Sequence, residues 1–207
     1  MFESATARRR AIRTAAPAAG LLAAALLVWQ GSYAAFSATT TVPNNNWAAG
    51  AVSLLNDSNA GNAFTQTGSV AFNASGLKPG STGFRCIVVQ STGTLPALVH
   101  WYVPTAAETT TKALDANLNI SVDVDYGKQD TNCVGFPGAP VNIYNNTLAN
   151  AAANVNNYAT GVGTWAPTGT PPEYSTYRIT WTVPAGAPNT IQGGTASATF
   201  TWESQNT

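Results

Sequence analysis

The chain offers few side chains that could do chemistry, and the most suggestive are carboxylates. Asp123 and Asp125 alternate along one predicted strand, and Asp130 follows in the next turn. Three neighbouring carboxylates could hold Ca²⁺, which takes oxygen ligands in flexible geometry. The alternative is a solvated strand face with Lys128 as the counter-charge, and the lack of EF-hand spacing favours it. Calcium is therefore a secondary hypothesis, and no other cofactor is expected.

The single histidine, His100, lies among aromatic residues in a strand-like run. There is no HExxH pair for zinc, no GxSxG nucleophile elbow and no phosphate-binding GxxxxGK[ST]. A metal-dependent protease would have to use Asp123, Asp125 and His100, without the partners that a catalytic histidine needs. We therefore expect a structural histidine and a protein that is not an enzyme.

The two cysteines, Cys86 and Cys133, form no CxxC pair. In an oxidising compartment, two cysteines in one domain most simply form one disulfide. Cys86 lies in an apolar, strand-like run, which argues against an exposed reactive thiol. The sequence predicts a structural disulfide between them.

The N-terminal residues indicate the compartment. Four arginines precede the apolar run at 15–29, and small residues follow it at Ser32 and Ala34. This order is typical of a secretory signal peptide, and it predicts residues 1–34 as the leader, cleaved between Ala34 and Ala35. An uncleaved anchor is the alternative, but the run is shorter than the roughly 20 apolar residues of a membrane span. We expect a secreted protein that meets a membrane only through its leader.

Charge is sparse in the predicted mature part. Only 9% of the chain is charged, against roughly 25% in an ordinary globular protein. Removing the leader leaves five basic and eight acidic residues, a net charge of −3. So few cations argue against a nucleic-acid partner, whose phosphates must be neutralised.

Alternation of apolar and polar residues dominates the rest of the chain, and Gly/Pro turns interrupt it. This pattern predicts an all-β jelly roll or β-sandwich over residues 47–207. A short crossover helix is expected at 147–158, where Leu148, Ala152 and Val155 have helical spacing, and a loop at 160–173. The predicted strands cover 50–55, 69–74, 84–90, 98–103, 118–126, 177–183 and 198–202.

Residues 35–42 form a further β-capable segment, and residues 43–46 form a turn-prone linker. The segment could be the first strand of its own domain, as most terminal strands are. It could instead pair with the next molecule, as in donor-strand complementation. The alternation alone favours the first reading.

Several stretches together resemble the TasA/camelysin family, in its actinobacterial form. The leader boundary at 32–37 resembles that of proteins cut by the SipW-type signal peptidase. Residues 77–80 (LKPG) and 85–89 (RCIVV) match a pattern of the family in order and spacing. The runs 177–180 (YRIT) and 199–203 (TFTWE) resemble the closing strands of the family.

The resemblance implies a jelly roll that is secreted and assembles into extracellular or cell-surface fibres of the biofilm-matrix type. Its partner would be another copy of the chain or a related fibre subunit. Carried over by position, donor-strand complementation falls on 35–42, which reverses the preference drawn from the alternation. The metallopeptidase activity described for camelysins is not carried over, because the zinc-binding histidines are missing. The predicted subunit-interface residues are Ala35, Phe36, Ala38, Thr40 and Val42.

A monomeric module that binds cell-wall carbohydrate is the competing interpretation. Exposed aromatic side chains could stack on sugar rings, and Trp47, Trp101 and Trp165 are the candidates. A sandwich core would bury most of them. Their burial therefore separates the two interpretations.

Overall fold

The computed structural model describes residues 37–42, 52–57, 63–66 and 68–207. The chain divides into two compact units, Met1–Ala35 and Phe36–Thr207. The predicted leader and its cleavage site at Ala34 and Ala35 lie outside the described residues. In the part of the chain that is described, no helix has the length and apolar character needed to cross a bilayer.

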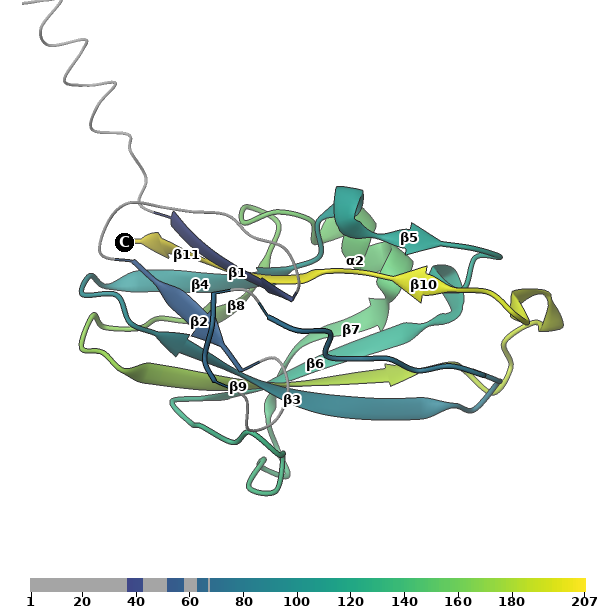
Figure 1. The fold of residues 1–207 in the computed structure, drawn as a ribbon, viewed down its shortest axis with the longest axis horizontal. Helices are drawn as coiled ribbons and strands as arrows, with labels where there is room; N and C mark the ends of the chain where they lie inside the picture. Colours follow the sequence, from purple (N-terminus) through teal and green to yellow (C-terminus); the bar gives the residue numbers. More distant parts are fainter. Residues whose placement is uncertain (1–36, 43–51, 58–62, 67) are drawn as a thin grey trace, which may run out of the picture. The chain divides into compact units, whose positions relative to one another are not determined.

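Two antiparallel sheets make up the second unit (Figure 1). The four-stranded sheet has the order β1-β11-β4-β8, and the five-stranded sheet has the order β2-β3-β9-β6-β7. The first contains β1 (Ser37–Val42), β11 (Phe200–Asn206), β4 (Ala97–Tyr102) and β8 (Val162–Trp165). The second contains β2 (Leu54–Asn56), β3 (Thr82–Ser91), β9 (Glu173–Thr182), β6 (Asn119–Tyr126) and β7 (Val141–Thr147).

The strand order confirms the predicted jelly roll. Most connections cross from one sheet to the other: β3 leads to β4, β7 to β8, β8 to β9 and β9 towards β11. This double Greek key brings the first long strand beside the last one. A small third sheet pairs β5 (Thr109–Thr110) with β10 (Ala196–Ser197), and three 3-10 turns (Thr105–Ala107, Asp115–Asn117 and Asn189–Ile191) complete the connections.

The alternation of β6 places one face in the core. Ile120, Val122 and Val124 are buried, while the residues between them are partly exposed. In β3 the run Cys86–Val89 is buried on both faces: Ile87 and Val89 belong to the core between the sheets, and the Cys86–Cys133 disulfide holds the 127–140 loop against the other face. Trp101 of β4 and Trp202 of β11 face this sheet from the other layer and are fully buried. Apolar packing between the sheets therefore stabilises the centre.

The predicted helix is present but shorter, as α2 (Leu148–Asn154). The Thr147 hydroxyl caps it by accepting a hydrogen bond from the Asn150 amide at 3.2 Å. Leu148, Ala152 and Val155 are all buried, as their spacing predicted. The helix links β7 to β8 and so carries the chain between the sheets (Figure 1).

Three local predictions are wrong. Residues 69–74 form no strand: the chain bends at Ala71, and the Ala71 carbonyl accepts a hydrogen bond from Arg85 Nε at 3.1 Å. The expected loop at 160–173 contains β8 and the first residue of β9, since β4 and β3 offer them pairing partners. The asparagine-rich β7 was not predicted, and its pairing with β6 overrides its poor intrinsic preference for a strand.

Candidate functional site

The predicted N-terminal strand is ordered by pairing with the last strand of the same chain. β1 runs antiparallel to β11 over six residue pairs, from Ser37 opposite Gln205 to Val42 opposite Phe200. β1 is the terminal strand of its sheet and has no second strand bonded to it. We call the position it occupies, beside β11 and over β2, the β1 slot. Within one molecule, the strand therefore completes its own domain.

Of the predicted interface residues, Ala35 and Phe36 lie outside the described residues. The backbone places Ala38 opposite Ser204 and Val42 opposite Phe200. Thr40 lies opposite Trp202, and its side chain is fully buried.

The β1 slot has a polar lining inside the protein. The Thr40 hydroxyl accepts a hydrogen bond from Asn56 Nδ2 of β2 and donates one to the Gln66 carbonyl at 3.1 Å. Because β1 and β2 belong to different sheets, the Thr40–Asn56 bond joins the two layers. Asn56 is itself fully buried and pairs through its backbone with Thr65.

Asp57, the next residue, is also fully buried. Its Oδ1 accepts a hydrogen bond from the Val88 amide at 2.8 Å and so holds the end of β2 against β3. Its Oδ2 is buried with no hydrogen-bond partner among the described residues. Burial raises the pKa of this carboxyl to about 6, although the Val88 amide opposes the shift. The edge of the sandwich thus contains a carboxyl that titrates well above its usual range.

Two buried hydroxyls lie on β11, on opposite faces of the strand: Ser204 shares the face of Trp202 and Thr40, and Thr201 is on the other face. Thr201 and Ser204 are buried, and neither hydroxyl oxygen has a hydrogen-bond partner in the described part of the chain. They lie opposite Thr41 and Ala38 of β1, respectively. Sequence reasoning missed Asn56, Asp57, Thr201 and Ser204, because polar side chains in a strand are ordinarily assigned to its wet face.

The structure does not gather the three candidate calcium ligands into a site. Among the residues that can be placed, no group of three or more His, Cys, Asp or Glu side chains could hold a metal ion. Asp123 Oδ2 pairs with Arg178 at 3.0 Å, and its Oδ1 accepts a hydrogen bond from Asn142 at 2.8 Å. The Asp130 amide donates to the Thr176 hydroxyl at 2.9 Å. The counter-charge of Asp123 is therefore Arg178 on the neighbouring strand, rather than the expected Lys128.

His100 lies on β4, in the opposite sheet from Asp123 and Asp125 of β6. Its Nδ1 is 2.8 Å from the Tyr158 carbonyl, and its ring stacks on the Tyr158 ring with centroids 4.5 Å apart. The residues required by the protease hypothesis are thus not brought together. Packing on Tyr158 and a contact with its carbonyl account for the position of His100.

The aromatic residues proposed for sugar stacking are not exposed. Trp101 and Trp165 are buried, with 0% and 5% of their surface exposed. Trp47 lies outside the described residues. The carbohydrate-binding interpretation therefore loses the two candidates whose positions are known.

The predicted disulfide between Cys86 and Cys133 is confirmed, with the two Cα atoms 5.5 Å apart. It ties the 127–140 loop to the outer face of β3. In the same loop, Phe136 lies under the Arg178 guanidinium, which is 4.5 Å from the ring centroid. A disulfide is consistent with an oxidising extracellular environment.

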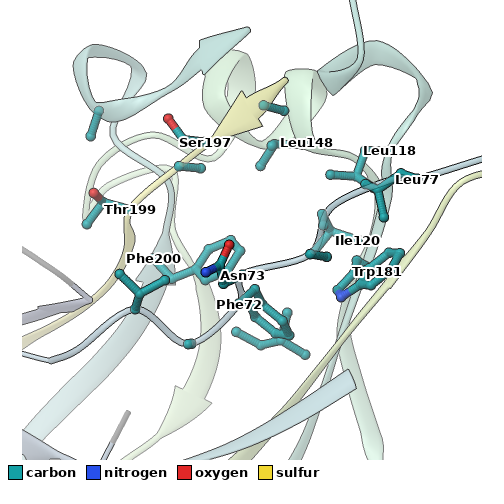
Figure 2. A pocket seen from close by; sticks show the side chains of 17 residues that line it. Phe72, Asn73, Leu77, Leu118, Ile120, Leu148, Trp181, Ser197, Thr199 and Phe200 are labelled. Atoms are coloured by element: carbon teal, nitrogen blue, oxygen red, sulfur yellow. The ribbon is translucent and has the colours of Figure 1, made fainter. Parts of the chain in front are cut away.

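One apolar pocket of about 510 Å³ opens between residues 70–77 and 196–200 (Figure 2). Ile120 and Trp181 of the five-stranded sheet lie on one side, and Phe200 on another. None of its lining residues is charged, and Asn73, Ser197 and Thr199 supply polar atoms. Sequence reasoning could not have found the pocket, because its walls come from segments far apart in the chain.

Comparison of the sequence with models of known protein families and with curated proteins finds no match. The geometry described above therefore carries the functional argument. The β1 slot is the feature that could serve another molecule, because the strand that fills it is terminal and continues into the predicted linker.

Proposed function

We propose that this chain is a secreted structural subunit of extracellular or cell-surface fibres and polymerises by exchanging its N-terminal strand. In the polymer, β1 of one subunit would occupy the β1 slot of the next. The resemblance to the TasA/camelysin family supports the proposal, as do the leader-like N-terminus and the disulfide.

The observation that carries the proposal is the position of β1. Among the described strands it is both the first and an edge strand, and its backbone pairs with β11 alone. A terminal strand of this kind can leave its slot without breaking the connection of any other strand. Exchange of an identical element then replaces each contact within the chain by the same contact between chains.

Head-to-tail exchange also explains why fibres, rather than closed dimers, would form. A heterologous contact that does not close on itself generates a filament. Main-chain hydrogen bonds to β11 would supply affinity, as in other cases of strand addition. The linker at 43–46 would span the gap between subunits.

The test compares the mature protein, beginning at Ala35, with a variant that lacks residues 35–42. We expect regular filaments from the first and none from the second by negative-stain electron microscopy. A peptide of residues 35–42 should bind the truncated variant, and a scrambled peptide should not. Peptide binding also shows that the truncated domain is folded, as does a retained Cys86–Cys133 disulfide.

Filaments from the truncated variant would refute strand exchange. Uniform monomers of the mature protein across pH and concentration would refute self-assembly. Mixing the mature protein with a related fibre subunit would then test whether this chain is an accessory subunit of another protein's fibre.

A further inference from the structure

The strand in the β1 slot has a sequence that defines its own register poorly. Three threonines stand in a row at positions 39–41, so neighbouring positions offer the same side chain. A one-residue slip in a sheet exchanges the two faces of a strand, and a two-residue slip keeps them. Something outside β1 must therefore select one pairing.

Asn56 can make this selection. Its Nδ2 donates to the Thr40 hydroxyl inside the protein, where water cannot replace a lost partner. A slip of two residues would bring Ala38 or Val42 opposite Trp202 in place of Thr40. Neither residue has a hydroxyl, so Asn56 Nδ2 would remain buried without an acceptor, which is strongly unfavourable.

The backbone that carries the Asn56 side chain is also held in place from its own side. Backbone hydrogen bonds to Thr65 fix Asn56 on one flank, at 2.8 and 3.0 Å. On the other flank, Asp57 is bonded twice to Val88. The Asp57 carboxylate accepts a hydrogen bond from the Val88 amide, and the Asp57 amide donates one to the Val88 carbonyl. Because the backbone is fixed on both flanks, the Asn56 amide cannot leave the slot with its strand, and the Thr40 hydroxyl is the acceptor it meets there.

We infer that Asn56 is the specificity-determining residue of the β1 slot: it selects a strand with a hydroxyl at the position of Thr40 and thereby excludes the two-residue slips, while the exchange of faces disfavours a one-residue slip. The inference applies to β1 of the same chain and, if the proposed function holds, to β1 of another copy. A single buried asparagine fixes register in the same way in coiled coils, at some cost in stability.

Cysteine pairs can report the register. Glu203→Cys is combined in turn with Thr39→Cys, which lies opposite it in the observed pairing, or with Ser37→Cys or Thr41→Cys, which would face it after a two-residue slip. The native disulfide occupies both natural cysteines, so the introduced pair reacts alone. Mild oxidation and a non-reducing gel then measure each cross-link.

We expect the Thr39→Cys pair to form at least about tenfold more cross-link than the other two pairs, since an unpaired buried donor is that unfavourable. In the Thr40→Val/Asn56→Leu background, the three yields should converge to within about threefold. Replacing both partners by apolar groups of similar shape is nearly neutral for stability, so this background should fold.

Thr201→Val is the matched control. It makes the same change at a buried threonine of β11, on the face opposite to Trp202 and Thr40, whose hydroxyl has no hydrogen-bond partner among the described residues, so the register preference should persist. The inference fails if the double variant keeps the full preference, or if Thr201→Val abolishes it equally.

The gel also separates this inference from the proposed function. A cross-link within one chain leaves a monomer, whereas cross-links between chains produce a ladder. Monomers with the predicted preference would support the role of Asn56 and contradict strand exchange. A ladder without register preference would support exchange and contradict the role of Asn56.

Discussion

At the centre of the five-stranded sheet, β3 and β9 pair over ten residue pairs, and the side chains that they turn inwards are mostly apolar. At the edge, the two sheets meet through the Thr40–Asn56 hydrogen bond, beside a buried carboxyl. The centre is further tied by the disulfide at Cys86, whereas the edge strand β1 is joined to β11 on one side alone. Apolar packing provides stability without selecting one partner, and a buried polar contact selects a partner at a cost in stability.

Under the proposed function, this difference lets one domain keep its core while it exchanges a strand. The centre can persist while β1 changes places, because β1 is not part of its strand pairing. The polar edge is specific but less stable, so a strand there can be exchanged and still be recognised. The predictions below test this division, beginning with the largest effect.

Breaking the centre should have the largest effect. Replacing Cys86 and Cys133 together by serine should lower the free energy of unfolding by about 4 kcal/mol, for a link that spans 47 residues. Urea unfolding of the two proteins measures this. Under conditions in which the variant is folded, it should still form filaments. Loss of filaments from the folded variant would contradict the division between centre and edge.

Asp57→Asn should stabilise the edge at neutral pH. The folded state raises the pKa of Asp57 from 3.8 to about 6, so the folded protein binds the extra proton more tightly than the unfolded chain does. Stability from this group is full below pH 4 and is lost as the pH rises through about 6. At pH 7 the variant should therefore be more stable than wild type by about 3 kcal/mol.

The measurement is urea unfolding of both proteins at pH 4 and at pH 7. The two should be nearly equal at pH 4, where the wild-type carboxyl is neutral. An equal difference at both pH values would show that Asp57 does not titrate in this range.

Thr40→Val should destabilise the folded domain by about 2 kcal/mol, because it leaves Asn56 Nδ2 buried without an acceptor. Thr201→Val, the same change on β11, should leave stability equal or higher, because its hydroxyl has no partner in the described part of the chain. Thermal unfolding of both variants gives the comparison. Equal losses would show that threonine packing, rather than the hydrogen bond, determines the result.

Asp123→Asn should have the smallest effect, within about 1 kcal/mol, because the Asp123–Arg178 pair lies on a partly wet face. Added salt should reduce the difference further. Unfolding at low and high ionic strength provides the measurement. A larger, salt-independent loss would show that this pair belongs to the structural centre.

Much of the fold could be predicted from local sequence. The alternation in β6 and β9 identified their buried faces, and the spacing of Leu148, Ala152 and Val155 identified the helix, because strand and helix periodicities are local properties of the chain. The alternation indicated an all-β protein, and two cysteines in a chain with a predicted leader indicated the disulfide. The strand predicted at 69–74 is absent because strand formation also depends on tertiary pairing, which local sequence does not specify.

Only the tertiary structure decided which side chains meet. Asn56 and Asp57 look like ordinary polar residues before a turn, and they become a buried polar site because β1 of the other sheet and β3 of their own enclose them. The pairing of Asp123 with Arg178 likewise joins residues 55 positions apart. The sequence by itself determined the faces, the disulfide and the strand-like N-terminus, since these follow from residue type and period. The slot, its buried carboxyl and the pocket depend on long-range pairing, which the fold as a whole imposes.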